Sequence, residues 1–203
     1  MPVPMRQVFQ EAREFFMGES NVQKAAEKVC RYLEDMKIPY ALCCGLAVNR
    51  YGLKRMTEDV DILLTREGLA QFKQRWLAAG WVERFPGSKG LRDPENKVKI
   101  DVLLTGKIPG DGKTAPFGFP DPGTVSQPDE DGIRVLSLAA LIQLKLASGM
   151  TSPHRLQDFA DVLRLIEANK LPRDYAAELH EYVRGKYDEL WQAAQTVDPQ
   201  EEA

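Results

Sequence analysis

Two aspartates, Asp59 and Asp61, stand two residues apart in a short run of apolar and β-branched residues. Side chains alternate between the two faces of a strand, so both carboxylates are expected on one face, with Val60 and Ile62 turned toward a core. Neighbouring acids on such a surface repel each other and lose hydration, and a bound divalent cation would relieve both costs. The spacing therefore favours a metal site.

A third acid, Asp101, lies in the centre of a second apolar run, 98–104. Three carboxylates that converge from two strands form a set of hard oxygen ligands suited to Mg²⁺ or Mn²⁺. The alternative interpretation is that the acids are solvated at a strand end and have only a structural role.

The elements that position these acids follow from hydrophobic periodicity and from Gly and Pro. The predicted helices are 7–37, 46–51, 66–79, 138–148, 153–168 and 173–194, and the predicted strands are 40–44, 59–64, 81–85, 97–104 and 133–135. Segment 106–132 is predicted to be a long loop over the site. It holds a Gly-Lys-Thr sequence, but Lys107 stands where a phosphate-binding P-loop needs Gly.

This order of elements predicts an α+β fold, with a small mixed β-sheet flanked by helices and a C-terminal helical bundle. We expect an α/β domain with N-terminal helices over 1–136, a helical subdomain over 137–195 and a flexible tail over 196–203.

Composition narrows the class of protein. The chain has 203 residues, 43% of them hydrophobic, which is enough for one compact domain with a helical extension. The net charge of −3 argues against binding nucleic acid by bulk charge, although a local basic groove stays open. Three cysteines, two of them adjacent, do not build a disulfide framework. Without a membrane-length or signal-like apolar stretch, the chain is predicted to be cytoplasmic, with no membrane partner.

The order of strand, Gly45, short helix, Thr57-x-Asp59-x-Asp61 and a later Asp101 resembles the nucleotidyltransferase fold of the DNA polymerase β superfamily. The resemblance is closest to small bacterial and archaeal members, which include the AbiEii-like toxins of type IV toxin–antitoxin systems. It covers about residues 40–166 and includes a downstream pair of helices. The family's turn is usually Gly-Gly or Gly-Ser, whereas here Leu46 follows Gly45.

The resemblance implies transfer of a nucleoside monophosphate from an NTP to a hydroxyl group, with Asp59, Asp61 and Asp101 as catalytic residues and ligands of Mg²⁺ or Mn²⁺. The nucleotide-binding residues that it implies are Gly45, Leu46, Arg55, Lys145 and Asp158. The residues themselves leave alternatives open. Arg55 could be a solvated loop residue, and Lys145 and Asp158 could form a salt bridge between helices, with Asp161 a supporting or surface acid.

The acceptor of the transferred group is not determined by these residues. By resemblance it could be a tRNA or other RNA, a protein or a small molecule, and a toxin would have a cognate antitoxin as partner. The alternative function is a non-catalytic nucleotide-binding or protein-interaction module on the same fold.

Overall fold

The computed structural model describes residues 10, 12, 14, 20–77 and 80–196. Its centre is a seven-stranded mixed sheet with the strand order β3-β4-β5-β2-β1-β7-β6. The strands are β1 (Tyr40–Leu42), β2 (Asp59–Leu64), β3 (Val82–Glu83), β4 (Leu91–Arg92), β5 (Lys99–Leu104), β6 (Ser126–Pro128) and β7 (Arg134–Leu136). β2 is parallel to β5 and β1 is parallel to β7, whereas the other pairs are antiparallel. The predicted α+β class with a mixed sheet is confirmed.

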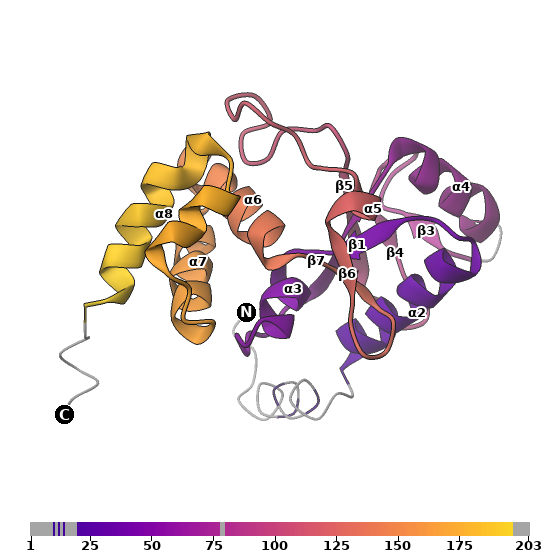
Figure 1. Ribbon diagram of the computed structural model, residues 1–203. Coiled ribbons are helices and arrows are strands. Elements are labelled where there is room, and N and C mark those ends of the chain that lie inside the picture. Colours follow the sequence, from indigo (N-terminus) through magenta and orange to yellow (C-terminus); the bar gives the residue numbers. More distant parts are fainter. Residues whose placement is uncertain (1–9, 11, 13, 15–19, 78–79, 197–203) are drawn as a thin grey trace.

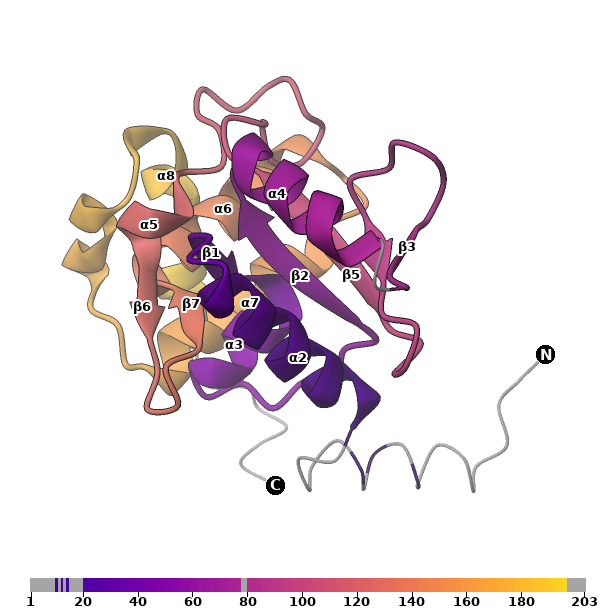
Figure 2. The same cartoon turned by 90° about the vertical axis from the view of Figure 1, so that its right-hand side faces the viewer.

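Helices cover both faces of this sheet (Figure 1). On one face lie α2 (Asn21–Asp35) and α4 (Arg66–Trp76), which Figure 2 shows in front of the strands. On the other side lies the C-terminal helical cluster, with α3 (Cys44–Arg50) between it and the sheet. The cluster consists of α6 (Leu138–Thr151), α7 (Leu156–Ala168), the 3₁₀ helix η2 (Arg173–Glu178) and α8 (Glu181–Ala194). None of the helices within the described ranges has the length and apolar character that crossing a membrane requires.

The face of the sheet under α2 is sealed by apolar side chains. Val60 and Ile62 of β2 are fully buried, and Val29 and Leu33 of α2 are buried as well. Each such side chain contributes roughly 1.5–3 kcal/mol when it leaves water. Ser20 caps the N-terminus of α2, because the backbone N–H of Gln23 donates to its hydroxyl. One face of β2 thus packs in the core, and the acids Asp59 and Asp61 lie on its opposite face.

The turn after β1 differs from the prediction. The strand ends at Leu42 rather than at residue 44, and α3 begins at Cys44, so Gly45 lies inside the first turn of a helix. A short apolar run is compatible both with a buried strand and with the start of a buried helix, so the sequence pattern could not locate the end of the strand. Cys44 has a φ of 48°, and this left-handed conformation turns the chain into α3.

Other differences involve short elements without clear periodicity. β4 lies between the predicted strands 81–85 and 97–104, where no strand is predicted, and the predicted loop 106–132 contains α5 (Pro122–Val125) and β6. The predicted helix 173–194 is divided into η2 and α8, and the side chain of His180 caps α8 by accepting from the N–H of Tyr182. Most of the predicted helix before residue 20, and the predicted flexible tail from residue 197 on, lie outside the described residues.

Candidate active site

The three predicted acids meet on one face of the sheet. β2 and β5 are parallel neighbours, and Asp61 and Asp101 are partners in their register. Partners in adjacent parallel strands point to the same face, and the strands are about 5 Å apart. Asp59 lies two residues earlier on β2 and shares that face, with Lys99 as its register partner. The sheet therefore gathers all three carboxylates beside the C-terminal helices.

Asp61 carries the electrostatic consequence of this arrangement. Its pKa is raised to about 6, first by burial and then by the negative charges of Asp59 and Asp101. The Cys44 thiol and the Lys145 ammonium act in the opposite direction but do not cancel the shift. Burial and two neighbouring carboxylates thus disfavour the ionised form of Asp61, and a bound cation would relieve both effects.

The donor set fits a hard divalent cation by its chemistry, since all three groups are carboxylates. Two of them have other partners in the structure. The Thr57 hydroxyl donates to Asp59 over 3.2 Å, and Arg84 Nη1 lies 3.3 Å from Asp101 Oδ1. Across the described ranges, no three His, Cys, Asp or Glu side chains are gathered into a ready-made metal-binding cluster. Asp59, Asp61 and Asp101 are therefore residues that could hold Mg²⁺, and their side chains would have to draw together to do so.

Gly45 sets the distance between α3 and the segment that leads into β2. A Cβ atom at this position would lie 2.8 Å from Thr57 Oγ1 and 2.9 Å from Thr57 Cβ, so no larger residue fits without a shift. Asn49 of α3 adds a second connection, because its side chain donates to the carbonyl of Arg55 and accepts from the Arg55 N–H. Leu46 is half-buried and packs against the core. Contact of Gly45 or Leu46 with a nucleotide stays a prediction.

Replacing Gly45 with alanine is expected to lower the free energy of unfolding by about 1–3 kcal/mol, because the new methyl group overpacks against Thr57. Gly185 is the matched control, since it is also a helical glycine but has no atom within 4 Å of an added Cβ. Gly185→Ala is expected to raise stability by up to about 1 kcal/mol through helix propensity. Urea denaturation of both variants measures the difference, and equal effects at the two positions would contradict the packing argument.

A buried cluster of charges connects the acid strand to the C-terminal helices. Asp161 of α7 is only 1% exposed and accepts from the Lys145 ammonium over 2.7 Å. Arg55 Nη1 donates to both Asp161 oxygens over 2.9 and 2.7 Å, and Gln157 donates to Oδ1 over 2.9 Å. Lys145 also lies 2.9 Å from Asp158 Oδ1. The salt bridge between helices that the sequence left open is therefore present, with Asp161 at its centre.

The pKa shifts in this cluster keep its members charged. Burial alone would raise the pKa of Asp161, but Lys145, Gln157 and Arg55 outweigh burial and lower it. Burial alone would lower the pKa of Lys145, but the charges of Asp158 and Asp161 outweigh it and raise the pKa. Both groups are thus ionised near neutral pH. The guanidinium of Arg55 has a carboxylate partner here, and its contact with phosphate stays a prediction.

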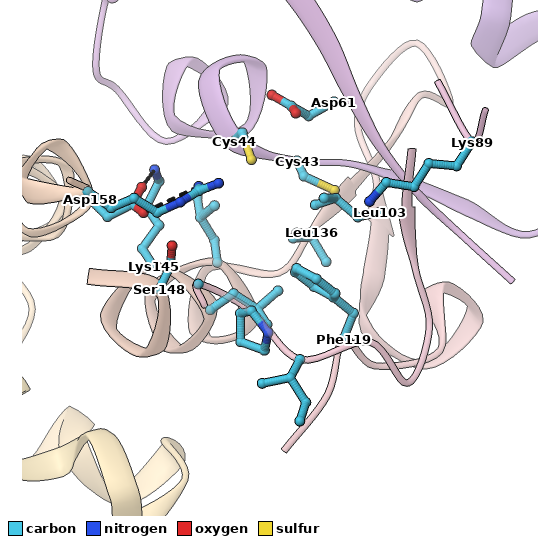
Figure 3. Close-up of a pocket in the computed structure, with 16 residues that line it drawn as sticks. Cys43, Cys44, Asp61, Lys89, Leu103, Phe119, Leu136, Lys145, Ser148 and Asp158 are labelled. Atoms are coloured by element: carbon cyan, nitrogen blue, oxygen red, sulfur yellow. Dashed lines mark hydrogen bonds and ion pairs between the residues drawn. The ribbon is translucent and has the colours of Figure 1, made fainter. Parts of the chain in front are cut away.

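A cavity of about 210 Å³ lies between the acid face of the sheet and helix α6 (Figure 3). Asp61, Lys145 and Asp158 all line it, so the structure brings together these acids and the lysine from three separate segments. Apolar side chains from β5, β7 and the loop after β5 form its other wall. Arg55, Gly45, Leu46, Asp59 and Asp101 do not line this cavity.

Sequence reasoning missed several residues of the cavity. Lys89 comes from a glycine-flanked turn between β3 and β4, and Phe119 comes from the end of the loop after β5. Ser148 lies on the buried side of α6. Each belongs to a segment whose place in the fold depends on long-range packing, so no local pattern marks it as part of a site.

No protein-family model and no curated protein sequence matches this chain. Among solved structures, the chain is similar to an antigenic nucleotidyltransferase-like protein from Paracoccidioides brasiliensis. The TM-score is 0.46 and the identity is 17%, over 72% of this chain and 75% of that chain. This is a distant likeness in the arrangement of the backbone, and the functional argument rests on the site itself.

Proposed function

We propose that the protein is a metal-dependent nucleotidyltransferase, which moves a nucleoside monophosphate from an NTP to a hydroxyl group and releases pyrophosphate. The observation that carries this proposal is the register of the acids. Asp61 and Asp101 are partners on adjacent parallel strands, Asp59 shares their face, and burial together with the charges of Asp59 and Asp101 raises the pKa of Asp61. A cavity that also contains Lys145 adjoins this face.

In the proposed reaction, Asp59, Asp61 and Asp101 would hold Mg²⁺ or Mn²⁺. Such an ion, when bound, stabilises the negative charge that develops on the phosphate oxygens. The Asp101 carboxylate is suited to accept the proton of the attacking hydroxyl. As the new O–P bond forms at the α-phosphate, the bond to the bridging oxygen breaks and pyrophosphate leaves with that electron pair.

The lysines at the cavity have a supporting role in this proposal. Lys145 and Lys89 line the same cavity as Asp61, where their ammonium groups would offset the charge of a bound triphosphate. Arg55 and Asp158 act on this arrangement through the buried cluster, because they fix Asp161 and Lys145 respectively. Gly45 contributes by letting α3 approach Thr57, just before β2, and Leu46 packs against the core.

The proposal is tested by a transfer assay with α-³²P-labelled NTPs, Mg²⁺ or Mn²⁺, and a mixed pool of cell RNA, protein and small metabolites. Label is expected to move to one acceptor class, and the Asp59→Ala, Asp61→Ala double variant is expected to lose transfer by at least about 10³-fold, several kcal/mol of transition-state stabilisation. Transfer to tRNA, together with growth arrest on expression of the wild type only, would support the narrower AbiEii-like toxin function with an antitoxin partner.

The second candidate is a non-catalytic nucleotide-binding or protein-interaction module. The ion pair between Arg84 and Asp101 favours it, because a carboxylate held by an arginine is less available to a metal ion or a proton. This candidate predicts Mg²⁺-dependent NTP binding without transfer to any acceptor. Recovery of transfer in an Arg84→Ala variant would instead identify the ion pair as a brake on an active enzyme.

A further inference from the structure

The face of the sheet that carries the acids also carries a row of positive charge. Asp59 of β2 is the register partner of Lys99 in β5. Lys99 is in turn the partner of Arg92 in β4, and Arg92 is the partner of Val82 in β3. Side chains of register partners lie side by side on one face of a sheet. Lys99, Arg92 and Val82 therefore continue the row of Asp59 outward to the edge of the sheet.

This row is open to solvent. Val82 is 55% exposed, and Arg92 and Lys99 are exposed as well, so the described part of the chain leaves them uncovered. The opposite face of β3 lies against α4, where the Lys73 ammonium donates to Glu83 over 2.6 Å. The C-terminal helices follow directly on β7 and lie toward the other side of the molecule (Figure 1). The sheet thus presents an uncovered, positively charged face over β3, β4 and β5.

Arg84, which follows β3, connects this face to the acids. A Cβ on Gly90 would lie 3.0 Å from Arg84 Cδ and 3.2 Å from Asp101 Oδ1, so the missing side chain leaves Arg84 room to cross to Asp101. The resulting ion pair is 3.3 Å long, and its two side chains are 49% and 35% exposed. Because water reaches both partners, the pair is weak and a competing anion can replace Asp101. A phosphate that binds Arg84 would thereby release Asp101.

An exposed aromatic ring stands beside these cations. Phe85 follows Arg84 in the chain and is 63% exposed. Only its backbone takes part in the turn before β4, where its carbonyl accepts from the Ser88 N–H over 2.9 Å. Single-stranded nucleic acids bind to surfaces that combine cations for the phosphates with aromatic rings for the bases. An acidic protein segment would match the cations but would gain little from the ring, so the combination favours nucleic acid.

We infer that the uncovered face of β3, β4 and β5 binds a single strand of nucleic acid. The phosphates of the strand contact Arg84, Arg92 and Lys99. One of its bases stacks on the ring of Phe85. The net charge of −3 argues only against binding by bulk charge, and these cations form a local basic surface. A strand on this face leads to the three acids, so its terminal hydroxyl would be the acceptor of the transferred group. That assignment as acceptor rests on the proposed function, whereas binding of the strand does not.

Fluorescence anisotropy in EDTA, with labelled RNA and DNA strands of about 12 nucleotides, measures this binding. The Arg92→Gln, Lys99→Gln double variant is expected to weaken it by roughly 10-fold at low salt. The slope of log K against log salt should fall by about 1.4, which is about 0.7 for each lost phosphate contact. The matched control is Lys24→Gln, Arg66→Gln, which removes the same charge from exposed positions on α2 and α4 and should change neither quantity.

Phe85→Ala separates stacking from charge. It is expected to weaken binding by about 5-fold or more without changing the salt slope, because one base loses its stacking surface. Thermal unfolding of each variant checks that it is folded. Tighter binding of RNA than of DNA would assign a contact to the 2′-hydroxyl, and equal binding would assign the recognition to phosphates and bases alone. An oligoglutamate peptide serves as the probe for an acidic protein segment.

The outcomes separate this inference from the proposed function. The Asp59→Ala, Asp61→Ala double variant should bind the strand at least as tightly as the wild type, since it removes negative charge beside the cations. Strand binding that depends on Arg92 and Lys99, without transfer by the wild type, would keep the inference and remove the transferase proposal. Transfer to a protein or a small molecule without strand binding would do the reverse. A loss in the Arg92→Gln, Lys99→Gln variant no larger than in its control would overturn the inference, as would tighter binding of oligoglutamate with no effect of Phe85→Ala.

Discussion

Asp161→Ala is expected to lower the free energy of unfolding by about 3 kcal/mol, because it leaves a buried lysine without one of its two carboxylates and an arginine without its partner. Asp161 is almost fully buried and accepts hydrogen bonds from Arg55, Lys145 and Gln157. These three donors come from the segment before β2, from α6 and from α7. Loss of the carboxylate should therefore loosen the C-terminal helices from the acid strand.

Denaturant titration at pH 7 measures this effect, with Asp158→Ala as the control. Asp158 bonds to the same lysine but is less buried, so we expect a smaller loss of about 1.5 kcal/mol. Acidification adds a second test. Because the pKa of Asp161 is lowered in the folded protein, its contribution is complete above its unfolded value of 3.8 and is lost as the pH falls below that value. A loss for Asp161→Ala no greater than that for Asp158→Ala would show that Asp161 is not the centre of the cluster.

The acid strand is the part of the fold that the sequence predicts best. The bounds of β2 are those predicted, 59–64. Asp59 and Asp61 alternate with Val60 and Ile62, and strict alternation of polar and apolar residues is typical of a strand and does not fit the period of a helix. The predicted start of α6 at residue 138 is also confirmed, and Ser137 caps it by accepting from the N–H of Ala140. Local patterns of this kind fix an element and its buried face without reference to the rest of the chain.

The buried face of α7 shows where local patterns fail. Hydrophobic periodicity predicts that Leu156 lies on the apolar face of this helix. In the structure Leu156 is 71% exposed, whereas the acid Asp161 is buried. Asp161 is satisfied by Arg55, which is 106 residues away in the chain, and by Lys145 on another helix. Burial of a charge depends on such remote partners, and periodicity within one helix cannot reveal them.

The same reasoning applies to the site as a whole. Register between β2 and β5 brings Asp101 to Asp61, and this agrees with the convergence of two acidic strands predicted from sequence. The cavity beside them is formed by Lys89, Phe119 and Ser148, whose segments meet only through tertiary packing. The sequence could therefore predict that the three acids share one face of the sheet, but not the shape of the cavity beside them.

Asp61→Asn is expected to have opposite effects on stability and on activity. In metal-free protein with EDTA at pH 7, the variant should be more stable than the wild type by about 3 kcal/mol, since each unit of pKa shift corresponds to about 1.36 kcal/mol. The sign follows from the raised pKa of about 6, compared with 3.8 for an ordinary Asp. The folded state holds its proton more strongly, so wild-type stability falls as the pH rises from about 4 to about 6. The Asn variant lacks this dependence.

The proposed nucleotidyl transfer should fall by on the order of 10³-fold in Asp61→Asn, because one carboxylate of the proposed metal site is lost. Glu58→Gln, at an exposed neighbouring position, should change stability by less than about 0.5 kcal/mol and leave transfer intact. A purely structural acid would show the gain in stability without any loss of function. A gain in stability together with a loss of transfer activity would instead mean that the repulsion among these carboxylates is retained for function. A less stable Asn variant at pH 7 would contradict the electrostatic argument on which the whole site is built.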